Sequence, residues 1–174
     1  ASGGSMGERV RVQSAGGISF NGDTATANAL DDYEEGSWDA SIQGAEGGGP
    51  TSYSSSGQYT KVGRLVNITV AWSNITFPGL GGQLEISLPF TSANSGGAWF
   101  GGDCYYYPNS VWDDYTDFIG MTPHIPANSN AIILRVKLKD SDRQTTQSAG
   151  SGGRNGNVSE ATGVYLSFSM TYWT

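Results

Sequence analysis

The chain has 174 residues and a net charge of −7, with 26 glycines and 37% hydrophobic residues. This size and apolar content fit one domain with a buried core and many tight turns, and they argue against disorder. The acidic balance argues against binding to nucleic acid or anionic lipid, because both need clustered Lys and Arg.

Strands are predicted along most of the chain, after residues 1–7, which read as a flexible linker or a remnant of expression. Three segments alternate apolar and polar residues, so each puts its apolar side chains on one face. These alternating positions are Val66, Ile68, Val70 and Trp72, then Leu84, Ile86 and Leu88, then Val164, Leu166, Phe168, Met170 and Tyr172. The predicted strands cover residues 8–14, 16–23, 57–72 as two strands around Gly63, 82–88, 97–107, 117–121, 131–138 and 163–173. Such regularly spaced short strands indicate an antiparallel β-sandwich or barrel.

One short helix of about two turns is predicted between Asn28 and Gly36. Asn28 can accept hydrogen bonds from the first exposed amides, and Gly36 can supply a left-handed stop. We expect the helix to dock Leu30, Tyr33 and Trp38 onto the strands, because so short a helix is not stable alone.

Four carboxylates crowd this same stretch, at Asp31, Asp32, Glu34 and Glu35. A metal site needs several oxygens converging on one point, and the stretch lacks the spaced Asp/Asn pattern and closing Glu of a calcium loop. We therefore interpret the four acids as a solvent-exposed structural face, with a metal site as the alternative.

Residues that build metal or redox centres are scarce. Cys104 is the only cysteine and His124 the only histidine, which excludes an intrachain disulfide, a Cys-based zinc site and a multi-His site. His124 stands between two prolines in "TPHIP", which predicts an exposed loop residue. No apolar run approaches the roughly 20 residues of a membrane span, so we expect no membrane insertion, and we expect no cofactor and no metal.

Three segments in order resemble one family. "GGISFNGDTATANALDDYEEGSW", "GQYTKVGRLVNITV" and "LEISLPFTSANSGG" are similar to a C-terminal domain of tail fibres and related virion proteins of bacteriophages, especially marine and cyanobacterial ones. The preceding "ERVRVQSAGG" resembles the strand and turn that end a fibre shaft. The similarity covers roughly residues 8 to 97, and the segment "GSWDASI" departs from the family, whose members more often read "GTWTP".

The resemblance implies a homotrimeric fibre tip, located in the virion and outside the cell when it meets a host. It divides the chain into residues 8–38, a shaft end and collar with the short helix, and residues 39–174, an all-β head predicted as a jelly-roll-like antiparallel β-sandwich. The shaft strands cannot bury their apolar side chains alone, so these are the predicted trimer contacts. They are Val10, Val12, Ile18, Phe20, Leu30 and Tyr33.

Catalysis is not predicted. A nucleophilic hydrolase needs a base beside its Ser or Cys, and the chain offers one histidine and no G-x-S-x-G motif. Glycosidic bonds can be cleaved by paired carboxylates alone, and "WDDYTD" at residues 112–117 contains several. Adjacent carboxylates in a strand would however point to opposite faces.

Aromatic rings interleaved with polar groups, in residues 99–118, predict a glycan-binding segment. Rings stack on the C–H face of a sugar, while carboxylates and amides bind its hydroxyls. The predicted ligand residues are Trp99, Tyr105, Tyr107, Trp112, Asp113, Asp114 and Tyr115. Consecutive tyrosines in a strand alternate between faces, so about half of the rings in this segment are expected to be core or subunit contacts instead.

Two functions are open at this stage. One is a tip that binds a host surface polysaccharide or outer-membrane component, and the other is a structural virion knob or decoration that binds other virion proteins. Exposed Trp and Tyr side chains clustered at the distal surface favour the first, and their burial between subunits favours the second.

Overall fold

The computed structural model describes residues 7–45, 47–77, 84–94, 100–101, 103–107, 118–138, 147–148 and 161–174. Within these ranges the chain is almost entirely β-structure, with one 3-10 turn, η1 (Thr26–Asn28), which confirms the predicted all-β class. The strands are β1 (Val10–Val12), β2 (Ile18–Phe20), β3 (Tyr33–Trp38), β4 (Ile42–Gly44), β5 (Ser52–Val62), β6 (Leu65–Phe77), β7 (Leu84–Ser87), β8 (Phe100–Gly101), β9 (Asp103–Tyr107), β10 (Phe118–Ile125), β11 (Ala131–Leu138), β12 (Gln147–Ser148) and β13 (Ala161–Trp173). In these parts of the chain, no helix is long and apolar enough to span a membrane.

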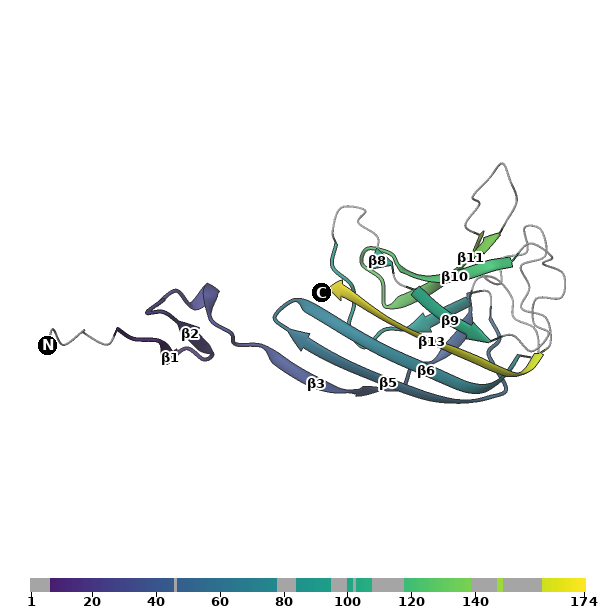
Figure 1. Cartoon of the computed structure of the whole chain (residues 1–174), viewed down its shortest axis with the longest axis horizontal. Helices are drawn as coiled ribbons and strands as arrows, with labels where there is room; N and C mark the ends of the chain where they lie inside the picture. The colour runs from purple at the N-terminus through teal and green to yellow at the C-terminus, as the bar shows by residue number, and fades with distance from the viewer. Residues whose placement is uncertain are drawn as a thin grey trace, which may run out of the picture.

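One antiparallel sheet forms the head, in the order β3-β5-β6-β13-β9-β10-β11-β7-β4. Strand β12 pairs with β11, and β8 pairs with β10. The sheet curls, so that β10 and β11 lie over β13 and β6 (Figure 1). Its two edges meet where the chain passes from β3 to β4, because the Trp38 indole donates to the Ser87 carbonyl at 3.2 Å and the Ser41 amide donates to the Ser87 hydroxyl at 3.0 Å.

The core lies inside this curl. All three apolar series predicted from alternation are buried, which confirms the assignment of faces in β6, β7 and β13. The two largest of these side chains also satisfy their polar atoms: the Trp72 indole donates to the Ala40 carbonyl at 2.8 Å, and the Tyr172 hydroxyl donates to the Phe90 carbonyl at 3.0 Å. Because buried polar atoms are costly unless they are bonded, these contacts fix how the sheet folds over its core.

The predicted helix between Asn28 and Gly36 is wrong. Tyr33–Trp38 instead forms β3, an edge strand that pairs with β5 along its whole length, so the head sheet begins before residue 39. Asn28 does not cap a helix, because its side-chain amide donates to the Asp23 carboxylate at 2.7 Å.

Two glycine–aromatic pairs explain why this stretch is a strand. Gly36 is opposite Tyr59 and Gly57 is opposite Trp38, so each ring lies over the glycine of the neighbouring strand. A Cβ on Gly57 would be 2.7 Å from the Trp38 ring and 2.8 Å from the Trp38 carbonyl oxygen. Cross-strand packing of rings on glycines fixes register, and it overrides the local helix signals.

A small separate sheet precedes the head and projects away from it (Figure 1). Val10 pairs with Phe20, Val12 pairs with Ile18, and Ile18 forms a further bridge with Leu30. Directly paired residues point to the same side of a sheet, so these five side chains share one face. We call them the extension face. Each is exposed, from 37% at Ile18 to 78% at Val12.

His124 is in a strand and is buried, so its prediction as an exposed loop residue is wrong. It belongs to β10 and is 7% exposed. Its neighbour Pro123 is opposite Leu134 within the β10–β11 pair, so the prolines do not break the strand here. The Arg135 guanidinium donates to Nδ1 of His124 at 2.9 Å. Burial, aided by the nearby Arg135 charge, lowers the pKa of His124 to about 4.

Candidate ligand-binding face

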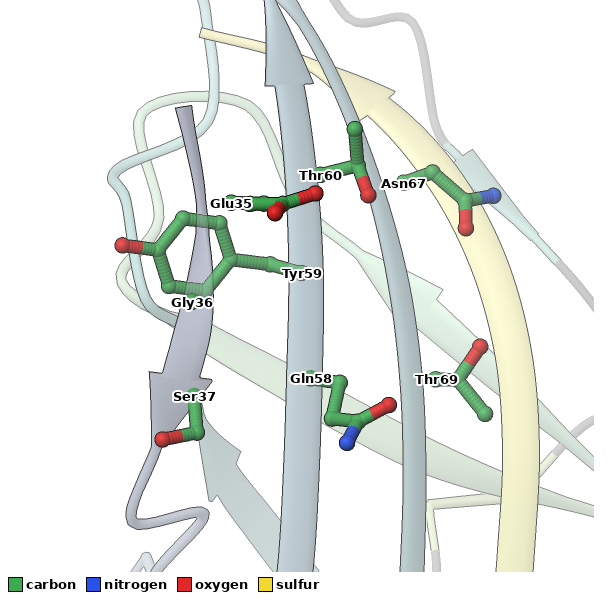
Figure 2. A pocket seen from close by; sticks show the side chains of 8 residues that line it. All are labelled: Glu35, Gly36, Ser37, Gln58, Tyr59, Thr60, Asn67 and Thr69. Carbon is green, nitrogen blue, oxygen red and sulfur yellow. The ribbon is translucent and has the colours of Figure 1, made fainter. Parts of the chain in front are cut away.

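The outward face of β3, β5, β6, β13 and β9 is organised in rows that run across the strands, because each residue points the same way as its direct partner. Two rows are polar. Glu35, Thr60, Asn67 and Thr171 form the first, and Ser37, Gln58, Thr69 and Ser169 form the second. Figure 2 shows most of these side chains side by side on β3, β5 and β6, where they line an open groove of about 530 Å³.

A second groove, of about 310 Å³, lies further along β5 and β6 on the same face. We call it the tyrosine groove. Its outward-facing floor consists of small residues, among them Ser56, Ala71 and Ser167, which are direct partners in register. Tyr105 and Tyr165 also line it, and they are 65% and 42% exposed.

The two tyrosines are diagonal neighbours on β9 and β13, since Tyr105 is opposite Ser167 and Tyr165 is opposite Tyr107. Diagonal neighbours of this kind are about 7–8 Å apart, within reach of aromatic side chains. The Tyr165 hydroxyl donates to Oδ1 of Asn74 at 3.1 Å, which orients its ring. No charged side chain is found among the described residues that line this groove.

The structure describes only part of the predicted glycan-binding segment. Tyr105 is exposed, as a ligand residue has to be, and the backbone of Tyr107 belongs to β9. Trp99, Trp112, Asp113, Asp114 and Tyr115 lie outside the described residues. Tyr165 was not predicted, although an aromatic at an outward position of an otherwise Ser- and Thr-rich strand face was a usable signal.

The acidic stretch does not converge on one point. The Asp32 carboxylate forms an ion pair with Lys61. The Glu34 carboxylate accepts a hydrogen bond from Tyr59 at 2.6 Å, and that of Glu35 accepts one from the Tyr33 hydroxyl at 2.7 Å. The carboxylates raise the pKa of both tyrosines by accepting these bonds. Over the described ranges, no group of three or more acidic, His or Cys side chains is placed to hold a metal ion.

Cys104 points into the head from β9, opposite Phe168 of β13. Burial raises the pKa of its thiol to about 12. A thiol in this environment stays protonated at neutral pH and is a poor nucleophile.

A row of apolar side chains lies on the outward face of the head sheet, at the end nearest the small sheet formed by β1 and β2. It consists of Tyr33, Val62, Leu65 and Trp173, which are direct partners across β3, β5, β6 and β13. All four are exposed. The large apolar side chains exposed in the described chain therefore fall into three groups: the extension face, this apolar row and the two tyrosines of the groove.

Comparisons with known proteins do not identify the chain, because no family model, curated protein or solved structure matches it. The functional argument therefore depends on the sequence resemblance and on the arrangement of exposed side chains.

Proposed function

We propose that this chain is the tip domain of a bacteriophage tail fibre, a non-enzymatic module that works as a homotrimer and attaches the virion to glycan on the host cell surface. In this proposal the curled sheet is a jelly-roll-like sandwich head. The small sheet before it is the end of the fibre shaft.

The extension face is the observation that carries the proposal. Five apolar side chains lie on one side of a sheet of three short segments, and all five are exposed. A sheet this small is marginally stable alone and needs a covered apolar face. Three copies around an axis would cover each other, as the resemblance to a fibre shaft implies. Each of the predicted trimer contacts on this face has the exposure that such an assembly needs.

The apolar row extends the same argument to the head. Tyr33, itself a predicted trimer contact, begins β3 directly after the extension, and it continues across the sheet into Val62, Leu65 and Trp173. Exposed apolar residues scattered singly need no explanation, whereas a contiguous row marks a contact surface. We therefore add these three residues to the proposed subunit contacts.

The position of the exposed Tyr105 and Tyr165 rings favours host attachment over a purely structural knob. β13 begins at the end of the head far from the extension and ends near it (Figure 1). Tyr165 is near the start of β13, so the tyrosine groove is distal to the proposed shaft while the apolar row is proximal. A distal pair of exposed rings suits contact with a host.

A non-enzymatic role agrees with the state of the two best nucleophile or base candidates. The ring of His124 is buried and bonded to Arg135, and the thiol of Cys104 is protonated at neutral pH. Neither is exposed to a substrate in an activated form.

The test is binding of fluorescently labelled protein to intact cells, measured by flow cytometry across a panel of marine bacteria and cyanobacteria. We expect saturable binding to a narrow set of hosts, reduced when the cells are treated to oxidise surface glycans. The matched control is the double variant Val12→Asp, Phe20→Asp, which should keep a folded head but lose the gain from multivalency. Binding to no host, together with capture by other virion proteins, would favour the structural knob.

A further inference from the structure

We propose that the tyrosine groove is a subsite for one neutral sugar ring, held against Tyr105 and Tyr165 over a floor of small residues. The inference rests on the proposed attachment function and specifies its ligand and its location.

The shape of the groove suits a flat, compact ring. Ser56, Ala71 and Ser167 form a low floor across three strands, because none of them carries a side chain beyond its Oγ or Cβ. Tyr105 of β9 and Tyr165 of β13 are the exposed aromatic side chains that line the same groove. The volume of about 310 Å³ is at the small end of ligand sites, enough for one or two sugar rings and too small for a folded partner.

The chemistry of the lining matches the two kinds of surface that a pyranose presents. Tyrosine rings offer apolar faces to the C–H groups of a sugar, while their hydroxyls and the serine hydroxyls can bond its OH groups. The ring of Tyr165 is fixed in advance by its bond to Asn74, so less conformational freedom is lost on binding. Asn74 itself is in the left-handed region at φ 54°, where the β13–β6 register shifts.

Charge decides the class of sugar. The chain carries a net charge of −7, and the described lining of the groove has no Lys or Arg to pair with an acid. A uronic or sialic acid would lose hydration of its carboxylate without gaining a partner, whereas a neutral hexose would not. We therefore assign the groove to neutral sugars.

The two polar rows lie next to the tyrosine groove, so they could bind further sugars of a glycan chain whose first ring occupies the groove. The pair Gln58 and Thr69 lies beside the pair Ser56 and Ala71 on the same face of β5 and β6. Amide and hydroxyl groups spaced along two adjacent strands are suited to the hydroxyls of a linked second or third sugar. A linear neutral glycan would therefore run from the tyrosine groove toward Glu35.

The test uses the full chain with ¹³C-labelled tyrosine rings, titrated by NMR with neutral trisaccharides of glucose, mannose and galactose and with tri-galacturonate. We expect at least one neutral trisaccharide to shift the Tyr105 and Tyr165 signals at millimolar concentration, with no shift from tri-galacturonate. Tyr105→Ala and Tyr165→Ala should each weaken binding about two- to tenfold, and Tyr165→Phe should weaken it less. Gln43→Ala, an exposed position of β4 that lines neither groove and belongs to none of the proposed subunit contacts, is the control and should bind like the parent.

A second variant, Ala71→Leu, tests the floor without removing a ring, and it should abolish the shifts while leaving the melting temperature within a few degrees. Equal binding of tri-galacturonate, no shift with any trisaccharide, or unchanged binding in the tyrosine variants would overturn the assignment. Cell binding separates this failure from that of the proposed function. If the tyrosine variants attach to host cells like the parent, only the subsite is wrong, whereas a parent protein that binds no cells contradicts attachment itself.

Discussion

Acid should destabilise the head through His124 before it reaches the carboxylates. In the folded chain burial and the Arg135 charge lower the pKa of His124 from its ordinary value of 6.5 to about 4. In the unfolded chain the imidazole takes up a proton as the pH falls below 6.5, so in this range the unfolded state binds more protons than the folded state. The stabilisation is therefore complete above about pH 6.5 and is lost as the pH falls toward 4.

The size of the effect follows from the shift. A change from 6.5 to about 4 corresponds to at most about 3–4 kcal/mol, and partial screening by solvent at the strand reduces the expected loss to about 1–2 kcal/mol. Protonation would also place a second cation against the guanidinium of Arg135, whose bond requires an unprotonated Nδ1.

The assay is urea unfolding at pH 7.5, 6.5, 5.5 and 4.5 at one fixed protein concentration, because the stability of an oligomer depends on concentration. Since the chain has no other histidine, His124→Gln should remove most of the slope between pH 6.5 and 4.5. The His124→Gln variant can differ from the parent in stability at pH 7.5 without affecting the test, because the test compares only how steeply each protein loses stability with acid. A variant that loses stability with acid as steeply as the parent would refute the reasoning.

Two further predictions concern the edge strand β3. Gly57→Ala should destabilise the head by about 1–3 kcal/mol, because the added Cβ meets the Trp38 carbonyl as well as its ring, and Gly36→Ala should cost less, because only a side chain has to move there. Equal melting temperatures for the two variants would contradict this packing. Replacing Asp32 and Glu35 together by Asn and Gln should change stability by about 1 kcal/mol or less, as expected for exposed charges, and EDTA should leave the melting temperature unchanged. A drop with EDTA that calcium restores would instead indicate a metal held by the acids.

Alternation was sufficient to predict the part of the core that β6, β7 and β13 supply, but not the part from β4, β10 and β11. In β6, β7 and β13 every second residue is apolar, and a period of two fixes which face is buried once the segment is a strand. The same pattern gave the polar outward face of β13, on which Tyr165 and Trp173 stand out as aromatic exceptions. Both side chains are exposed. An aromatic residue at an outward position of a polar strand face is therefore a sequence signal for a contact residue.

Long-range pairing explains what the sequence could not reveal. Residues 29–36 carry good local signals for a helix, but residues 33–38 form a strand because their cross-strand contacts with β5 are more favourable. Gly36 looked like a helix stop because nothing nearby in sequence indicates that Tyr59 lies over it. His124 was misjudged for the same reason, since proline flanks predict a loop unless the neighbouring strands are known. The tyrosine groove likewise depends on residues from four strands, β5, β6, β9 and β13, brought together by register.

The molar mass of the protein in solution tests the central claim most directly, because both the fibre-tip assignment and the multivalent attachment depend on the trimer. Light scattering coupled to size exclusion, at micromolar concentration and with residues 8–38 present, should give three times the 18.3 kDa of one chain, about 55 kDa. The variant Val12→Asp, Phe20→Asp should elute as a folded species of one chain mass. A parent protein of 18.3 kDa under the same conditions would contradict the account, because the extension face would then remain uncovered in water.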